Sequence, residues 1–590
     1  DHGDGQVHSH SHDEGSSEHG HSHGSDHTHT HDATVAEDQS DLTRLPGFQL
    51  LLNHVVKNAA FPNDMPEVLR TSLERGRDLY QRIVGLKEVP NLEAALAGRF
   101  VPPSTGGDPI RNDESLPTGR NLYGFDPSRV PTKEAWKTGQ ELVQGMIDDY
   151  VEKHGRYPNK MAFSLWSIET MRHYGVLESQ ALYAMGMRPV WKPNGRVVGA
   201  EIIPYAELKR PRIDVVLSAT GLYRDAFPGV MKRLADAVDK VAKLKEENNF
   251  VYRHTQRLQK ELEEQGLSPV DAQYLSTARI FSNERGTYGS GLASSIEASG
   301  TWTSDAELAD LYLARMGFVY GSDTKRWGEQ LENVDLYGKN LTGTDIALFS
   351  RSSNVYGLLS SDDPFQYLGG LSLAVRHLDG KSPEMFVSNL RNPNLARTET
   401  VGRFLSKELR TRYLHPRWVG EMKEEGYAGT LAAQSAVANF WGWQVVDPQN
   451  VRNDQWQEFY EVYVNDKYEL ELREWFEKHN PEALARLTMT MLEAIRKDYW
   501  QADSATLQKL LDTYRELDAM INMMTENEDY KDFVETRATG FGVDISASAQ
   551  APQAAVPPAP APTPEATGQD QTVTGQKLEK VEPGGETEFH

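Results

Sequence analysis

Three residues that can bind or transfer charge, Tyr223, Arg224 and Asp225, follow the apolar run Ile213–Leu217. The run is typical of a buried strand, and an amphipathic helix starts near Gly229. In open α/β sheets, side chains just past the carboxyl end of a strand line the ligand crevice, so these three residues are candidates for a site. The spacing alone also allows a turn in which Arg224 and Asp225 only pair or cap the next helix.

A second group of polar residues follows the expected strand Lys160–Leu165. It contains Trp166 and Glu169 at the start of a stretch, up to Met185, that has helical periodicity. If this strand neighbours Ile213–Leu217, Glu169 and Asp225 point toward one crevice. A carboxylate in such a crevice can act as a general acid or base.

The paired carboxylates Asp362 and Asp363 form a third candidate. Two adjacent carboxylates can hold a hard divalent cation or accept protons. An Asp-Asp-Pro sequence near a helix start is also a common cap, where the helix dipole favours negative charge. The sequence leaves both interpretations open.

The segment Asn283–Gly291 contains three glycines before a short expected helix. Glycines allow a close approach of the backbone to a ligand, although three glycines in a turn more often reflect the geometry of the turn alone. Ser294 stands where a dinucleotide fingerprint needs its third glycine, and Val375 stands where a nucleotide-binding loop ending at Gly380-Lys-Ser needs its first. We therefore expect no nucleotide site in this chain.

Histidine is concentrated at the start of the chain, where ten of the 18 histidines lie among Ser, Gly, Asp and Glu. We expect this low-complexity tract to be disordered, because it has too little apolar surface to form a core. Neutral imidazole binds divalent metals, so the tract either sequesters or delivers metal or is an inert solvated linker. The candidate metal ligands are His8, His10, His12, His19, His21, His23, His27, His29 and His31.

The composition excludes several classes of function. A net charge of −24 over 590 residues argues against a nucleic-acid partner, which needs clustered Lys and Arg. The absence of cysteine excludes disulfides, thiolate metal sites and cysteine nucleophiles. The apolar runs are too short to cross a bilayer, and the chain starts without Met or a signal-peptide pattern, so we expect a processed protein or a piece of a longer one.

The order of expected elements predicts an α/β fold with parallel or mixed sheet units, a largely helical C-terminal half and disordered tails. Strands are also expected at 188–191, 196–203 and 342–350, and the first two are taken as part of the parallel unit. The expected domains are a His-rich segment (1–44), an α/β unit (45–235), a mostly helical unit (236–545) and a Pro/Ala-rich tail (546–590).

Several segments occur in an order that resembles the large, porphyrin-binding subunits of cobaltochelatase and magnesium chelatase, the CobN/magnesium-chelatase H family. The segments are Leu116–Tyr123, Ala162–Arg172, Pro211–Pro228, Arg285–Leu292, Leu358–Gly370 and His415–Val419. The resemblance covers roughly residues 45–500. It extends in particular to the HmuS-type, CobN-like proteins of bacterial haem-uptake systems, through the segments Arg351–Gly357, Asn439–Trp443 and Val464–Tyr468.

The resemblance implies that the chain binds haem or another metallo-tetrapyrrole while iron, cobalt or zinc enters or leaves the macrocycle. Two pyrrole nitrogens must then gain or lose protons, and arginines can clamp the carboxylates of the macrocycle. Candidate proton-transfer or metal-handling groups are Glu169, Asp225, Asp362 and Asp363. Candidate tetrapyrrole-binding residues are Arg120, Asn121, Tyr123, Trp166, Arg172, Tyr223, Arg224 and Tyr288.

Two departures from the family pattern bear on the reaction and on partners. Ser360 and Leu368 stand where cobalt-inserting relatives usually carry Asp and His, which disfavours cobalt insertion. The family's upstream His- and Gly-rich motif is absent, so a missing N-terminal half or a partner chain is expected to complete the site.

Three functions stay open on the sequence. The first is removal of iron from haem in the bacterial cell envelope, on the periplasmic side, together with haem-uptake components. The second is cobalt insertion into a corrinoid precursor with separate ATPase subunits, and the third is a non-enzymatic haem or metal carrier. A cytoplasmic location is the alternative to the envelope.

Deletion of residues 1–40 should lower the amount of divalent metal that the purified protein retains on dialysis and leave tetrapyrrole affinity unchanged, because the His-rich tract is expected to act independently of the crevice. Metal analysis and a Soret-band titration measure the two quantities. Loss of tetrapyrrole binding in the deletion variant would contradict an independent tract.

Overall fold

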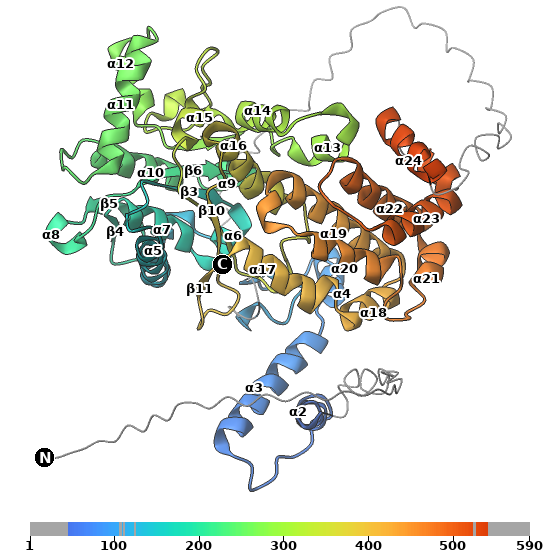
Figure 1. Cartoon of the computed structure of the whole chain (residues 1–590). Helices are drawn as coiled ribbons and strands as arrows, with labels where there is room; N and C mark the ends of the chain where they lie inside the picture. The colour runs from blue at the N-terminus through green and yellow to red at the C-terminus, as the bar shows by residue number, and fades with distance from the viewer. Residues whose placement is uncertain (1–44, 106–108, 110–112, 123–124, 523–526, 541–590) are drawn as a thin grey trace, which may run out of the picture.

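The computed structural model describes residues 45–105, 109, 113–122, 125–522 and 527–540 of the chain. The His-rich tract and the Pro/Ala-rich tail lie outside these residues. Figure 1 shows one body built from a central sheet and many helices, with a helical arm (residues 45–100) that projects from it. The arm contains α2 (Pro46–Leu51), the π-helix η2 (Leu52–Val56), α3 (Glu67–Val84) and α4 (Glu88–Leu96).

A seven-stranded, mostly parallel sheet organises the body, in the order β11-β10-β9-β3-β6-β7-β8. Its strands are β3 (Lys160–Leu165), β6 (Asp214–Ala219), β7 (Ile280–Ser282), β8 (Phe318–Val319), β9 (Ile346–Arg351), β10 (Glu384–Asn389) and β11 (Arg397–Thr400). β3 pairs in parallel with β6 on one side and β9 on the other, and only the edge strands β8 and β11 run antiparallel to their neighbours. The predicted α/β class with a mixed sheet is confirmed.

Alternate side chains of the central strands enter two separate cores, as the two-residue period of a strand requires. In β3, Met161, Phe163 and Leu165 pack with one set of helices, and Ala162 faces the other. Both faces are covered, which explains why these strands are almost continuously apolar. The first core is closed by α5 (Lys133–His154), α7 (Val176–Ala184) and α10 (Pro228–Val241).

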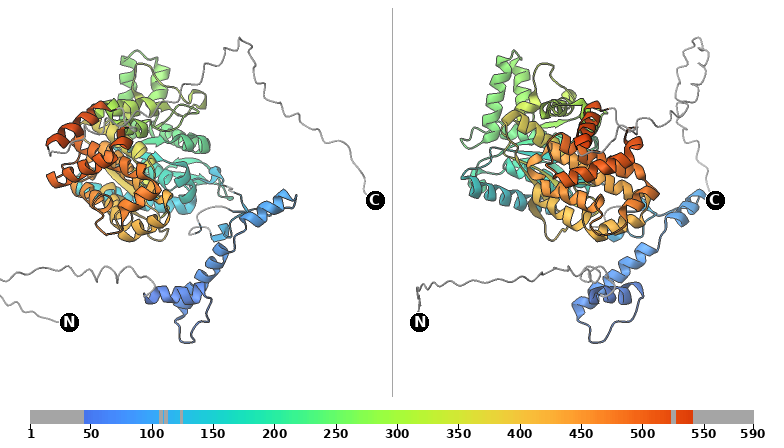
Figure 2. Two further views of the ribbon diagram at one scale, coloured as in Figure 1. Left: turned by 90° about the vertical axis from the view of Figure 1, so that its right-hand side faces the viewer. Right: turned by 45° about the vertical axis from the view of Figure 1, so that its right-hand side comes forward.

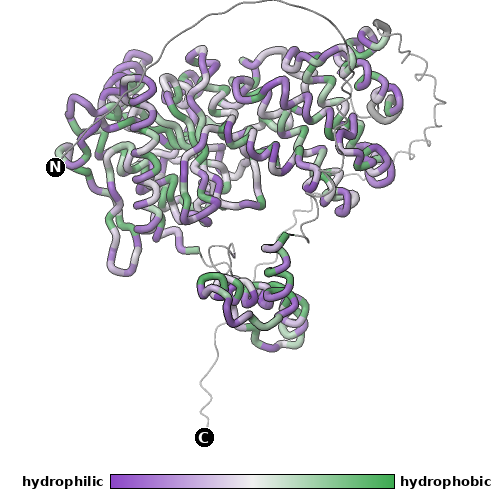
Figure 3. Tube along the Cα trace, turned by 60° about the horizontal axis from the view of Figure 1, so that its bottom comes forward, coloured by the Kyte–Doolittle hydropathy of each residue, from purple (hydrophilic) through white to green (hydrophobic). Residues whose placement is uncertain are grey.

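Helices cover the other face of the sheet and form the C-terminal half of the body, which the side views show as a separate layer (Figure 2). Between the strands they are α11 (Phe250–Glu264), α12 (Pro269–Ser276), α13 (Leu292–Glu297), α14 (Asp305–Met316), α15 (Leu336–Leu341) and α16 (Gly370–Asp379). After the sheet follow α17 (Val401–Glu408), α18 (Pro416–Glu424), α19 (Tyr427–Val446), α20 (Asn453–Tyr463), α21 (Leu472–His479), α22 (Pro481–Arg496), α23 (Ser504–Asn522) and α24 (Glu528–Gly540). Hydropathy alternates along most of them (Figure 3), as expected for helices with one buried face.

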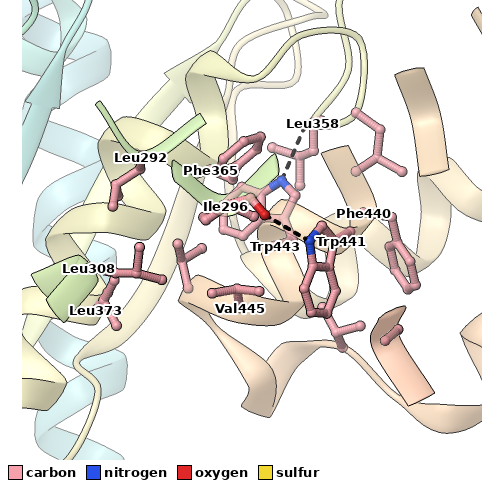
Figure 4. Close-up of a cluster of buried hydrophobic side chains, with 14 of the residues drawn as sticks. Leu292, Ile296, Leu308, Leu358, Phe365, Leu373, Phe440, Trp441, Trp443 and Val445 are labelled. Atoms are coloured by element: carbon pink, nitrogen blue, oxygen red, sulfur yellow. Dashed lines mark hydrogen bonds between the residues drawn. The ribbon is translucent and has the colours of Figure 1, made fainter. Parts of the chain in front are cut away.

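The apolar helix α19 runs through the middle of this half. Trp443 and Trp441 donate their indole N–H groups to the carbonyl oxygens of Leu358 (3.2 Å) and Ile296 (3.4 Å), as Figure 4 shows. Both indoles are buried, so each needs such an acceptor. These aromatic residues therefore belong to the core.

The structure corrects several expectations about individual elements. The strands expected at 188–191 and 196–203 form a separate antiparallel hairpin, β4 (Met187–Trp191) and β5 (Val197–Ile202), and not part of the parallel sheet. The helix expected over 166–185 is split into α6 (Ser167–His173) and α7, because Tyr174 and Gly175 both have positive φ. A short helix, α9 (Gly221–Ala226), stands where a turn was expected, and β7, β10 and β11 were missed.

Side-chain hydrogen bonds cap the start of two of these helices. Thr132 accepts the backbone N–H of Ala135 at the start of α5, and Ser268 accepts that of Asp271 at the start of α12. The seven-stranded sheet takes strands from both sides of residue 235, the expected boundary between the α/β and helical units.

A buried ion cluster holds the amino ends of the strands. Asp214, at the start of β6, accepts Nε of Arg279 at 2.8 Å and lies 2.9 Å from Nδ1 of His254. Burial opposes ionisation of Asp214, yet Arg279 and His254 hold its pKa well below the usual range. A carboxyl group with a lowered folded-state pKa stabilises the fold above its unfolded-state pKa of about 4, and this contribution is lost as the pH falls through the folded-state value.

Arg279→Met should lower the free energy of unfolding by about 3–5 kcal/mol, because it leaves the Asp214 carboxylate buried without its main partner. Urea unfolding measures the change. Arg257→Met is the matched control, since Arg257 is exposed and makes only a loose pair with Glu261 at 3.7 Å. Equal losses in the two variants would contradict a role for the buried pair.

Candidate functional site

The carboxyl ends of β3, β6 and β9 meet at one edge of the sheet, and Glu169 lies there in the first turn of α6. Its side chain is 3% exposed, and Oε2 accepts the hydroxyl of Ser352 at 2.7 Å. Guanidinium groups of Arg172 (3.5 Å) and Arg351 (3.7 Å) approach the other oxygen. The predicted residues Glu169 and Arg172 are therefore brought together, with two partners from the end of β9.

Arg351, the last residue of β9, is a central member of this site that the candidate residues omitted. Its guanidinium is buried, lies 4.9 Å from the ring centroid of Trp166 and donates to the carbonyl of Gly357 at 3.2 Å. Burial lowers the pKa of Arg351, and the negative charges of Glu169 and Glu408 oppose this effect. Glu169 is a candidate because it is a polar residue that follows the end of a strand. Arg351 stands at the end of β9, so the same criterion selects it as well.

Asp362 and Asp363 lie just before the π-helix η7 (Phe365–Gly369), in the segment that follows β9. The side-chain amide of Gln366 donates to Asp362 at 3.1 Å and to Asp363 at 3.3 Å. Burial raises the pKa of Asp363, and the neighbouring Asp362 raises it further, while Arg351 opposes both. Asp363 is thus a carboxyl group that retains a proton more readily than usual.

The glycine-rich loop (residues 283–291) packs against these aspartates through the same glutamine. Oε1 of Gln366 accepts the backbone N–H (3.0 Å) and hydroxyl (3.2 Å) of Ser290, and the Tyr367 hydroxyl accepts the N–H of Gly289. Gly221 allows the loop to lie directly on α9, since a Cβ there would meet Tyr288 at 2.7 Å. The loop is therefore a structural bridge between the ends of β6 and β9.

Arg224 binds the backbone of this loop. Its Nη1 donates to the carbonyl oxygens of Asn283, Glu284 and Thr287, at 3.0, 2.6 and 3.3 Å. Its other nitrogens donate to Asp225. These contacts occupy the buried guanidinium, which leaves little capacity for the carboxylate of a ligand.

Asp225 is more accessible, with 45% of its side chain exposed. It accepts Nε of Arg224 at 2.8 Å and the hydroxyl of Tyr288 at 2.7 Å. The hydrogen bonds from Arg224, and then from Tyr288, lower the pKa of Asp225 although partial burial opposes this. The pKa of Asp225 is therefore shifted in the opposite direction to that of Asp363.

The remaining candidate residues lie elsewhere. Tyr223 is fully buried, stacks on Phe227 and donates its hydroxyl to Glu178, so its ring is not available at the sheet edge. Arg120 and Asn121 lie at the short strand β2 (Asn121–Leu122), which pairs with β1 (Ser104–Thr105) and follows a contact between Gly119 and α4. Tyr123 and the predicted His ligands lie outside the described residues.

A cavity of about 1330 Å³ opens beside Asp362, between α13, α19, α22 and α24. Ile296, Phe365 and Trp441, all drawn in Figure 4, belong to its lining, together with Asn439. The volume exceeds the ~300–1,000 Å³ typical of small-molecule pockets. Most of its lining residues are polar or small, and Phe365, Trp441 and Tyr530 are the aromatic members, so the cavity offers a large surface of mixed polarity next to the Asp362 carboxylate.

No group of three or more His, Asp or Glu residues within the described part of the chain is arranged to hold a metal ion. No helix in that part is long and apolar enough to cross a membrane. The described residues therefore provide carboxyl and guanidinium groups at the sheet edge and an adjoining cavity, without a preformed metal site among them.

Comparison with known proteins identifies the family. A family model described as CobN/Magnesium Chelatase matches residues 6–507. The chain belongs to the CobN/magnesium chelatase family. The resemblance inferred from the motifs is thus confirmed at the family level.

Relatives in the CobN/magnesium chelatase family are considerably longer than this chain. The aerobic cobaltochelatase subunit CobN of Pseudomonas aeruginosa is 31% identical over 478 residues, which are 78% of this chain and 37% of that protein. The chloroplastic magnesium-chelatase subunit ChlH of Oryza sativa subsp. japonica is 32% identical over 502 residues, 82% of this chain and 34% of that protein. The solved catalytic subunit of cobaltochelatase from Mycobacterium tuberculosis matches with a TM-score of 0.71 and 30% identity, over 83% of this chain and 41% of that one.

Arg224→Lys should loosen the glycine-rich loop almost as much as Arg224→Met, because an ammonium group cannot reproduce the planar fork that reaches several carbonyls and Asp225 at once. Hydrogen exchange of the amides in residues 284–290 should speed up at least tenfold. Arg285→Lys, a change in the same loop at an exposed side chain, is the control. Retained protection in Arg224→Lys would show that charge alone holds the loop.

Proposed function

We propose that this chain is the part of a tetrapyrrole chelatase that carries proton-transfer groups, and that the reaction is removal of iron from haem. The observation that carries the proposal is the group of charged side chains Glu169, Arg351 and Asp363 at the sheet edge, of which the first two are buried and Asp363 is half-buried. The neighbouring Asp362 lines a large cavity. Membership of the CobN/magnesium chelatase family supports the tetrapyrrole as substrate.

The chemistry requires a proton donor close to the macrocycle. When a ferrous ion leaves the macrocycle, its bonds to the pyrrole nitrogens break and two N–H bonds form, without a change in oxidation state. Ferric haem must first accept one electron from an external one-electron reductant. Asp363 fits the donor role because burial raises its pKa, and Asp225 fits the role of a base or cation contact because its pKa is lowered.

The proposal that the metal is removed, and that it is not cobalt, is inferred from two departures from the family pattern. Cobalt-inserting relatives usually carry Asp and His where Ser360 and Leu368 stand. Here the Ser360 hydroxyl accepts the N–H of Gly357 at 2.8 Å and lies 3.0 Å from the Tyr413 hydroxyl, and Leu368 is fully buried in the core. Neither side chain offers a ligand for an incoming cobalt ion, which favours metal removal.

Metal insertion is the second candidate, because the relatives include subunits of cobaltochelatase and of magnesium chelatase. That reaction would need ATPase partner subunits, since the sequence lacks a nucleotide-binding loop. A carrier that only stores haem is the third candidate function. Storage would require the cavity but not a proton donor such as Asp363. Release of metal-free porphyrin separates removal from both alternatives.

The site is proposed to be completed by the portion of the family fold that has no counterpart in this chain, as a further part of the same protein or as a partner. The helical arm supports this, because many of its large apolar side chains are exposed, among them Val68, Leu92, Leu96 and Phe100. We also propose a place in the bacterial cell envelope with haem-uptake components. Fractionation of the source cells tests the location, and co-purification of the wild type and of Leu96→Asp tests the arm.

Anaerobic incubation of the protein with haem and dithionite should release porphyrin, detected by its fluorescence. Asp363→Asn and Glu169→Gln should each reduce the rate at least tenfold, because each removes a proton-transfer group from the sheet edge. Wild-type activity should fall as the pH rises through the pKa of Asp363, since the protonated form is the donor. Glu264→Gln, a change at an exposed helix position, is the control.

Binding of haem with a Soret shift but without release of porphyrin would rule out removal and favour the carrier. Full activity in Asp363→Asn would show that another group donates the proton. Insertion of cobalt by the protein together with an ATPase, in the absence of removal, would favour the second candidate.

A further inference from the structure

Glu178, on α7, is a fully buried carboxyl group beneath the candidate site. It lies between two short helices that carry site residues: α6, with Glu169, and α9, with Arg224 and Asp225. No motif or resemblance drew attention to it. The contacts that it makes explain why an acidic residue stands in this part of the core.

Both helices donate a hydrogen bond to the same oxygen of Glu178. The Thr170 hydroxyl, one residue after Glu169, donates to Oε1 at 2.8 Å, and the Tyr223 hydroxyl, one residue before Arg224, donates to Oε1 at 2.8 Å. Oε2 is buried without a hydrogen-bond partner in the described part of the chain. One carboxyl oxygen therefore ties α6 to α9.

Resting on the proposed function, we propose that Glu178 is a positioning residue that sets the distance between Glu169 and Asp225 across the ends of β3 and β6. Adjacent residues on a helix point in different directions, so Thr170 and Tyr223 can face the core while Glu169 and Arg224 face the sheet edge. A shift of either helix would move the site residue next to it.

α7 is suited to serve as the fixed reference, because its start, through His173 at the end of α6, and its middle are held to the sheet. Nδ1 of His173 accepts the N–H groups of Gly175 and Val176 at the start of α7, and Nε2 lies 3.0 Å from the hydroxyl of Ser350 in β9. Further along, Oε1 of Gln180 accepts the Ser388 hydroxyl of β10 at 2.9 Å. The helix that carries Glu178 is thus tied to two parallel strands.

The surroundings favour the neutral form of Glu178. Burial raises its pKa, and the hydrogen bonds from Thr170 and Tyr223 only partly oppose this. The charged group nearest in the small cavity beside it is Arg233 of α10, whose guanidinium donates to the carbonyls of Pro127 and Val130. An acid with a raised folded-state pKa stabilises the fold fully below its unfolded-state pKa, and this contribution is lost as the pH rises through the folded-state value.

The test compares two substitutions of nearly equal size. Glu178→Gln keeps a carbonyl oxygen as acceptor for both hydroxyls and cannot ionise, whereas Glu178→Leu removes the acceptor. Hydrogen exchange of α6 and α9 should match the wild type in Glu178→Gln and be at least tenfold faster in Glu178→Leu. In the haem assay, kcat should fall at least tenfold in Glu178→Leu with less than a threefold change in KM, and Glu178→Gln should restore kcat.

Two further variants keep the idea falsifiable if Glu178→Leu does not fold. Thr170→Val and Tyr223→Phe each remove one donor, so each should speed exchange mainly in its own helix, α6 or α9. Urea unfolding adds an independent readout, because the part of the decline of wild-type stability with rising pH that Glu178 contributes should be missing in Glu178→Gln, which makes the decline smaller.

Identical behaviour of Glu178→Gln and Glu178→Leu, or uniform exchange changes over the whole chain, would overturn the positioning role. The exchange data do not need activity, so they separate the two proposals. If the wild type releases no porphyrin, the proposed function fails, while the exchange pattern still decides whether Glu178 holds α6 and α9.

Discussion

The parallel pairing of β9, β3 and β6 is the constraint on which the candidate site depends. It brings the carboxyl ends of three strands to one edge of the sheet, so charged side chains near these ends, such as Glu169 and Arg351, are buried next to one another. A buried charge is tolerated only with partners, and here Glu169, Arg351 and Ser352 supply them to one another. The site is therefore a network whose members fix each other's positions.

A second layer of contacts extends this network across the sheet. The glycine-rich loop lies between the ends of β6 and β9, held by Arg224 from one side and by Gln366 from the other. Some residues whose chemistry suits contacts with a ligand are thus engaged in hydrogen bonds within the protein, and Arg224 is the clearest case. Asp363 and Asp225, the candidate proton-transfer groups, differ in the direction of their pKa shifts because one is desolvated and the other is hydrogen-bonded to a guanidinium.

The helical half contributes a large cavity next to the same edge. Asp362 lies both in the cavity lining and in the contact with Gln366, so the cavity and the strand-end network share a residue. The chain spans about a third of the length of its curated relatives, and the helical arm exposes several large apolar side chains.

The sequence by itself determined the elements with strong local signals. The apolar runs of β3 and β6 and the caps Thr132 and Ser268 are set by neighbouring residues, and the ordered motifs identified the family. Only the tertiary structure decided that 188–203 is a separate hairpin, because short strands show no mark of their pairing partner. It also decided which contacts Arg351 and Glu178 make and that Tyr223 is buried, since burial and hydrogen-bond partners come from residues far apart in the chain.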